Sequence, residues 1–80
     1  MEFVAIDVET ANADMASICQ IGIARFKDNA VVAEWSALVN PEDYFDLINI
    51  DIHGISEDDV VEAPIFPEIW NDLNRNRARL

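Results

Sequence analysis

Basic side chains and backbone breakers are both scarce in this sequence. It has five lysines and arginines against 16 aspartates and glutamates, and a formal net charge of −11. With only two glycines and three prolines, a collagen-like or low-complexity chain is excluded, and a hydrophobic fraction of 51% excludes plain disorder. The 80 residues allow one small domain, or part of one.

The negative charge limits the functions that the chain can serve. Nucleic-acid binding normally needs a basic groove that releases condensed counterions, and three of the five cations fall near the end, at Arg75, Arg77 and Arg79. A carboxylate cluster that holds a divalent cation is the exception, because the cation then meets the phosphate. Nucleic-acid chemistry therefore requires that acidic residues form a metal site.

A single cysteine, Cys19, rules out an internal disulfide. We expect a small buried residue in a strand rather than a nucleophile, because no histidine lies nearby in the sequence. No apolar run approaches membrane-spanning length, and no apolar leader follows Met1. These features predict a cytoplasmic protein without a membrane partner.

Three apolar segments in the first half predict β-strands. Phe3 to Ile6 is a continuous apolar run that ends at Asp7, which is typical of a strand buried on both faces. Ile18 to Phe26 alternates large and small residues, and Val31 to Val39 follows after a turn at residues 27–29. We expect the second and third strands to form an antiparallel hairpin beside the first.

The second half predicts two helices after an irregular connection over Tyr44 to His53. Ser56 and Asp59 have the spacing of a capping box, so a short helix should begin there and end at Ala63 and Pro64. A second helix should carry a proline in its first turn and one apolar stripe, formed by Phe66, Ile69, Trp70 and Leu73. Residues 74–79 should be a solvated helix end or a frayed tail.

Asp7 and Glu9 are the strongest candidates for chemistry. They lie two residues apart at the end of the first predicted strand, and side chains alternate across a strand, so both carboxylates should point to the same face. Mg²⁺ and Mn²⁺ favour such oxygen ligands, and two ions about 4 Å apart can clamp the attacking and leaving oxygens of a phosphodiester. The simpler interpretation, in which Asp7 caps a loop and Glu9 is merely solvated, stays open for the pair alone.

Three segments together resemble one enzyme family. They are FVAIDVET at Phe3 to Thr10, ICQIG at Ile18 to Gly22 and NIDIHGI at Asn49 to Ile55. Their order and spacing are similar to those of the DEDD-type 3′–5′ exonucleases, most closely those like the proofreading epsilon subunit of bacterial DNA polymerase III. The resemblance extends from Phe3 to Trp70. It implies an α/β, ribonuclease H-like fold, of which residues 1–80 would be the N-terminal portion: an antiparallel three-strand meander followed by helices.

The resemblance also implies roles for individual residues. Asp7 and Glu9 match the first motif, whose carboxylates hold two catalytic Mg²⁺ or Mn²⁺ ions. Thr10 matches a residue that contacts the terminal nucleotide, and His53 matches a substrate-contacting position near the last phosphate or sugar. The implied reaction hydrolyses terminal phosphodiesters at the 3′ end of single-stranded nucleic acid and releases nucleoside monophosphates. For His53 the alternative is a loop histidine bonded to the backbone.

The implied catalytic set is incomplete. The family needs four metal-binding acids and a general-base histidine, and its later members would follow the helix that ends near Leu73. His53 and Asp58 reproduce the spacing of the family's last motif, but Asp58 falls in the first turn of a capped helix, where the helix dipole accounts for it. We therefore expect residues 1–80 to be a partial exonuclease domain that is inactive alone.

Other interpretations concern what the chain binds. It could be a non-catalytic acidic interaction module with a vestigial metal site, which docks a partner through its acidic surface and the stripe over residues 66–73. A small acidic domain with no nucleic-acid role would require the three matching segments to be accidental. The family's fold places the first strand inside the sheet, so here it would have an unpaired edge, and exposed edges recruit neighbours. We therefore expect the chain to self-associate.

Overall fold

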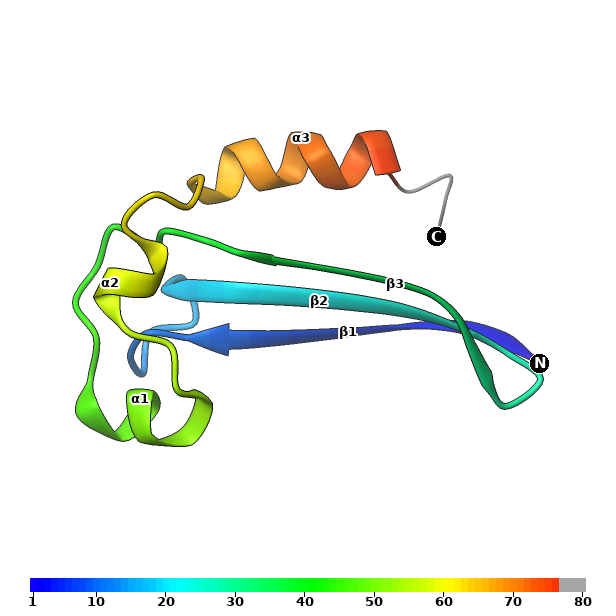
Figure 1. Cartoon of the computed structure of the whole chain (residues 1–80), viewed down its shortest axis with the longest axis horizontal. Helices are drawn as coiled ribbons and strands as arrows, with labels where there is room; N and C mark the ends of the chain where they lie inside the picture. Colours follow the sequence, from blue (N-terminus) through cyan, green and yellow to red (C-terminus); the bar gives the residue numbers. More distant parts are fainter. Residues whose placement is uncertain (77–80) are drawn as a thin grey trace.

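The structure, a computed structural model, describes residues 1–76 and consists of one antiparallel sheet with helices at one end and along one face (Figure 1). The strands are β1 (Glu2–Thr10), β2 (Ile18–Lys27) and β3 (Ala30–Leu38), in the order β1-β2-β3. The helices are α1 (Leu47–His53), α2 (Glu57–Val60) and α3 (Phe66–Asn76). The expected three-strand meander followed by helices is confirmed, whereas residues 77–79 of the predicted tail lie outside the described residues. None of the described helices is long and apolar enough to cross a membrane.

Two residues with left-handed backbone build the turn between β2 and β3. Asp28 has φ 51° and Asn29 has φ 70°. Aspartate and asparagine tolerate this conformation, and two such residues give a hairpin turn whose twist matches that of the flanking strands. The turn predicted at residues 27–29 is therefore confirmed, and β2 pairs antiparallel with both of its neighbours.

α3 covers one face of the sheet along the β3 side (Figure 1). Its residue Ile69 is 2% exposed and packs with Ile21 and Val39. Phe66 and Trp70 remain 41% and 53% exposed, so the four predicted residues lie on one helix but the stripe is only partly buried. One side of the helix contacts the three-stranded sheet, and apolar residues at the margins of that side remain exposed to water.

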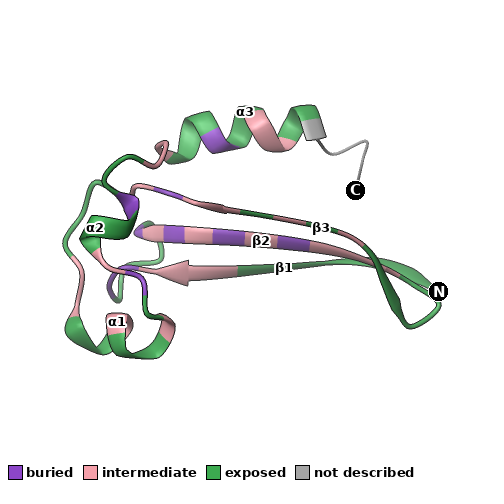
Figure 2. Cartoon of the chain, viewed as in Figure 1, coloured by how far each residue is buried: buried purple, intermediate pink, exposed green. Residues whose placement is uncertain are grey.

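A second group of buried residues lies at the end of the sheet where α1 and α2 pack (Figure 2). Cys19, Ile55 and Val60 form this cluster, and Cys19 is fully buried in β2, as predicted. The capping box also forms, because the carboxylate of Asp59 accepts hydrogen bonds from the backbone N–H and the hydroxyl of Ser56 at 2.8 and 3.2 Å. The short helix therefore begins where the sequence predicts it, but it ends at Val60, before the predicted end at Ala63 and Pro64.

The segment Leu47–His53 forms α1, so the prediction of an irregular connection is wrong there. The helix buries no residue, and three of its four large apolar side chains are exposed: Leu47, Ile48 and Ile52. In its sequence, apolar and polar residues alternate over 48–52, which is not the one-sided apolar periodicity by which a sequence indicates a helix. Gly54 ends it with φ 75° and donates its N–H to the carbonyl of Ile50 at 2.7 Å, a left-handed cap that suits glycine.

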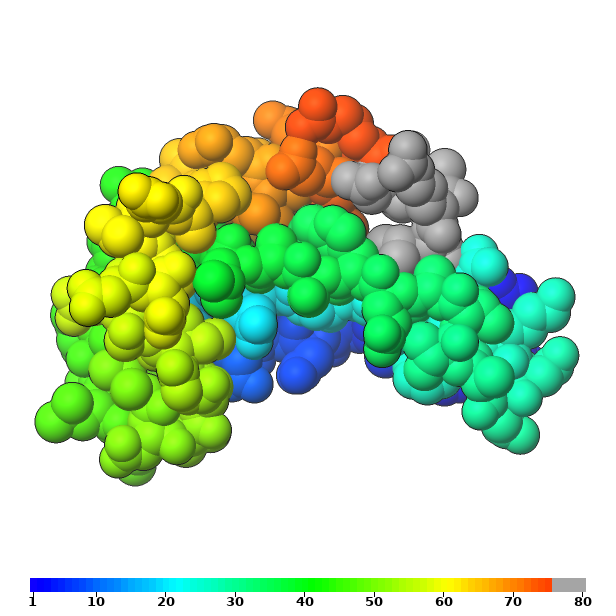
Figure 3. Space-filling model, viewed as in Figure 1, coloured from blue at the N-terminus to red at the C-terminus, as the bar shows by residue number. Residues whose placement is uncertain are grey.

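β1 forms one edge of the sheet, as expected, but it is not buried on both faces, which corrects the prediction from its apolar run. Phe3, Val4 and Ile6 are 48%, 53% and 66% exposed. Within the described chain β1 pairs only with β2. In the space-filling view it lies along an indentation between α1 and the β2–β3 turn (Figure 3). The apolar run is typical of a covered strand, but no described element covers its outer edge.

Candidate active site at the end of the first strand

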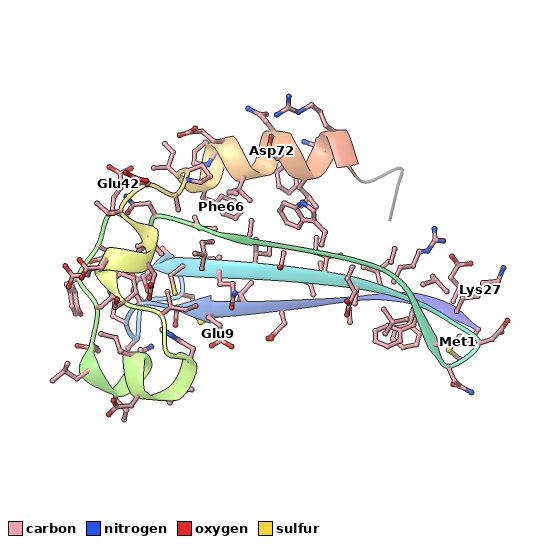
Figure 4. All side chains as sticks on the ribbon, viewed as in Figure 1. Met1, Glu9, Lys27, Glu42, Phe66 and Asp72 are labelled. Carbon is pink, nitrogen blue, oxygen red and sulfur yellow. The ribbon has the colours of Figure 1, made fainter. Side chains whose placement is uncertain are left out.

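Asp7 and Glu9 share one face of β1, as the alternation of a strand requires. In the register with β2, Asp7 lies opposite Gly22 and Glu9 opposite Gln20. Gly22 places no side chain beside Asp7, and a Cβ there would lie 3.9 Å from the carbonyl oxygen of Asp7. Asp7 is exposed, while Glu9 is half-buried beside α1 (Figure 4). The two carboxylates therefore lie on an open, uncrowded part of the sheet.

Neither carboxylate has an ion-pair or hydrogen-bond partner among residues 1–76. The ion pairs in this part of the chain join Arg25 with Glu2, Arg75 with Asp72, and the Met1 amine with Asp28. Two free carboxylates suit a hydrated Mg²⁺ or Mn²⁺, which needs one or two protein carboxylates and keeps water in its other positions. The described residues contain no group of three or more His, Cys, Asp or Glu side chains placed to hold a metal ion. The donor set fits an open, incomplete metal site.

A shallow hollow adjoins Glu9 at the end of β1. Its walls come from β1, the following loop and α1, and its lining residues are Val8, Glu9, Thr10, Met15, Asn49, Ile52 and His53. The structure thus brings together three of the four predicted site residues, although His53 lies far from β1 in the sequence. The fourth, Asp7, lines a neighbouring hollow on the sheet face together with Gly22 and Ser36.

The carbonyl oxygen of Thr10 receives two side-chain donors from α1. Asn49 donates from Nδ2 at 3.1 Å, and Nε2 of His53 lies at 2.9 Å. The same Nδ2 lies 3.4 Å from both the Thr10 hydroxyl and the carbonyl of Asn12. The register between β1 and β2 shifts between Glu9 and Thr10, so α1 holds the chain where the sheet pairing becomes irregular.

The His-Gly-Ile segment is a turn that fixes the histidine ring. Gly54 reverses the chain in its left-handed conformation, and the backbone N–H of Ile55 donates to Nδ1 of His53 at 3.0 Å. The side chain of Ile55 is buried beside Cys19. Both ring nitrogens of His53 are therefore bonded to the backbone, as in the simpler interpretation of this residue, except that His53 ends a helix rather than lying in a loop.

Cys19 lies beneath the same network. Its sulfur is 3.9 Å from Nε2 of His53. Burial, followed by the negative charge of Glu9, raises the pKa of the Cys19 thiol above its usual value. A raised pKa keeps the thiol protonated near neutral pH, which argues against a nucleophile even though a histidine is close in space.

Asn49 is the site residue to which the sequence analysis gave no role. It belongs to the NIDIHGI segment, and Asn49 and His53 are four residues apart, which places them on the same side of a helix. The four-residue spacing indicates a shared helix face, but only if the segment is predicted to be helical, and it was predicted to be an irregular connection. Asn12, 1% exposed, was also missed; its side chain donates to the carbonyl of Tyr44 at 2.9 Å and holds the loop after β1.

The candidate site is therefore an acidic pair on the strand that opens a meander, beside a hollow formed with a His-Gly-Ile turn. The exonuclease (RNase_T) family model matches residues 4–77, and the chain belongs to that family. The fold is accordingly ribonuclease H-like, as the resemblance implied.

One solved structure provides a detailed comparison. It is "Exonuclease X in complex with 5′ overhanging duplex DNA", with 27% sequence identity and a TM-score of 0.75. The match covers 82% of this chain but only 39% of the chain of that nuclease. The present sequence therefore corresponds to less than half of that protein. A search of curated proteins gave no significant match.

Proposed function

We propose that this chain is the N-terminal portion of a 3′–5′ exonuclease domain that hydrolyses terminal phosphodiesters of nucleic acid in the cytoplasm. One observation carries the proposal: in a member of the exonuclease family, Asp7 and Glu9 share an open face of β1 and have no partner among residues 1–76. The similar solved nuclease was determined in complex with DNA, which supports a nucleic-acid substrate. We propose the 3′ end of a single strand, with release of nucleoside monophosphates.

Two of the site residues would bind metal, and the other two would contact the substrate. Asp7 and Glu9 would hold Mg²⁺ or Mn²⁺, and the bound ion supplies the positive charge that this acidic chain lacks at the phosphate. Thr10 lines the hollow beside Glu9, where it would contact the terminal nucleotide. His53 lines the same hollow, but its nitrogens are bonded, so it would meet a substrate through the ring carbons.

Residues 1–80 alone should be inactive or nearly so. Asp7 and Glu9 supply two carboxylates, whereas the family reaction needs four acids and a histidine base. Without a base to deprotonate the attacking water, the hydrolysis rate should stay close to background. We propose that activity requires further residues of a complete exonuclease domain.

Metal binding is the direct test of the acidic pair. At Mn²⁺ concentrations about 100 times the dissociation constant, binding to the folded state should stabilise the protein by about 2.7 kcal/mol, seen as a higher melting temperature. Asp7→Ala should abolish this shift. Glu62→Ala removes an exposed acid away from the site and should retain it. Equal shifts in all three proteins would refute the metal site.

The alternative function is an acidic interaction module with a vestigial metal site. The exposure of Phe66 and Trp70 on α3 favours it, because large apolar side chains on a helix surface are a common feature of docking sites. The same titration separates the two functions, since a module would show no Mn²⁺ shift that depends on Asp7.

We also propose that the chain self-associates through β1. The strand offers an open edge nine residues long with exposed apolar side chains at Phe3, Val4 and Ile6. Open edges of this kind pair with other strands. Its acids oppose close approach of a second copy, so the association should strengthen as salt screens the charge.

A further inference from the structure

The hydrogen bonds of His53 define which of its nitrogens carries the proton. A carbonyl oxygen can only accept, so Nε2, 2.9 Å from the oxygen of Thr10, must be the protonated nitrogen. A backbone N–H can only donate, so Nδ1, 3.0 Å from the nitrogen of Ile55, must present its lone pair. Both bonds can exist together only in the neutral ring with the proton on Nε2.

We infer that His53 is a positioning residue, fixed as this neutral tautomer, which with Asn49 anchors the end of β1 that bears Glu9. The inference deepens the proposed function and rests on it, because it takes Glu9 of β1 to be a metal ligand. It differs from the role implied by the family resemblance, because neither ring nitrogen is available to bind a phosphate or to act as a base.

The position of the anchor explains why it matters for the acidic pair. Thr10 follows Glu9 directly, and the β1–β2 register shifts between these two residues before pairing resumes at Thr10 and Ile18. The two α1 donors add to this irregular pairing by binding the Thr10 carbonyl. Asn49 extends the hold to the Thr10 hydroxyl and to Asn12. Loss of the anchor should therefore displace the Glu9 carboxylate relative to Asp7.

The tautomer can be read directly by NMR. The chain has one histidine, so its imidazole ¹⁵N signals need no assignment by mutation. We expect a protonated Nε2 and an unprotonated Nδ1 near neutral pH in the metal-free protein. The opposite tautomer, or a rapidly exchanging mixture of the two, would overturn the inference. This measurement does not depend on metal binding, so it stands whether or not the proposed nuclease function holds.

Two substitutions separate the two bonds of the ring. In His53→Gln the side-chain amide nitrogen, which reaches further than that of asparagine, can take the place of Nε2 and donate to the Thr10 carbonyl. In His53→Asn the side-chain oxygen can take the place of Nδ1 and accept from Ile55, but the bond to Thr10 is lost. If the anchor positions Glu9, His53→Asn and Asn49→Ala should weaken Mn²⁺ binding by about tenfold or more, the range found for residues that orient metal ligands, and His53→Gln should restore most of it.

A purely structural histidine would give a different result. Both His53 variants would then lower the metal-free melting temperature and leave the Mn²⁺ dissociation constant unchanged, which would overturn the positioning role. Should the unaltered protein bind no Mn²⁺, the proposed metal site fails, and the backbone amide shifts of Glu9 and Thr10 become the test. They should move in His53→Asn and stay near their original values in His53→Gln, and equal movement in both variants would refute the anchor.

Discussion

The sulfur of Cys19 lies 3.9 Å from Nε2 of His53, although 34 residues separate them in the chain. One partner comes from the central strand at its irregular end, and the other ends α1. The contact joins the core cluster of Cys19, Ile55 and Val60 to the hollow that adjoins Glu9. Substitutions that alter the packing of this core should therefore also shift His53 at the candidate site.

The buried thiol predicts a loss of stability at alkaline pH. Burial, and then the charge of Glu9, raises the pKa of Cys19 in the folded state, so above the ordinary thiol value of about 8.5 the unfolded chain releases its proton first. Stability should fall as pH rises above that value. Urea unfolding at pH 7 and pH 10 should show a smaller loss for Cys19→Ala than for the unaltered protein. Parallel losses in both proteins would contradict the prediction.

The open edge of β1 predicts self-association that a single charge suppresses. Ile6→Lys places a charge in the middle of the exposed edge strand, and lysine on an edge is a common defence against pairing. Sedimentation should show the unaltered protein associating with rising concentration and salt, and the variant as a monomer. Val61→Lys makes the same change on an exposed residue outside the sheet and should associate normally. A compact monomer for the unaltered protein at high concentration would reject the prediction.

The two glycines should respond in opposite directions to alanine. Gly54 has φ 75°, so Gly54→Ala should cost about 1 kcal/mol even though no atom beyond the adjacent residues lies within 4 Å of the added methyl group. Gly22 lies in β2, where a Cβ makes only an ordinary 3.9 Å contact, so Gly22→Ala should leave stability unchanged or raise it by up to about 1 kcal/mol. Chemical denaturation measures both. Destabilisation of the same size in the two variants would show that the turn conformation is not the cause.

The packing of α3 predicts that neighbouring apolar residues differ in importance. Ile69 is 2% exposed against the sheet, so Ile69→Ala should destabilise the protein by about 2–5 kcal/mol. Trp70→Ala removes a larger side chain that is 53% exposed, and it should cost less. Thermal unfolding of the two variants checks the order. A larger loss for Trp70→Ala would mean that the exposed ring is covered in solution, as self-association or a partner would cause.

Different parts of the fold left different traces in the sequence. The β2–β3 turn and the start of α2 were predictable, because Asp28, Asn29 and the Ser56–Asp59 pair act on the backbone within a few residues. α1 was not predictable, since its apolar residues do not recur on one side of a helix. The acidic pair was predictable from strand alternation alone, but the role of Asn49 was not, because its acceptors lie on β1 and the following loop.

The sequence by itself determined that Asp7 and Glu9 lie on one face of a strand, because alternation of side chains is a local property of extended backbone. It also determined the family, through three short segments in a fixed order. Only the tertiary structure decided that the apolar side chains of β1 stay exposed and that both nitrogens of His53 are bonded. Burial and hydrogen bonding at these places depend on elements distant in the sequence, which only the folded chain brings together.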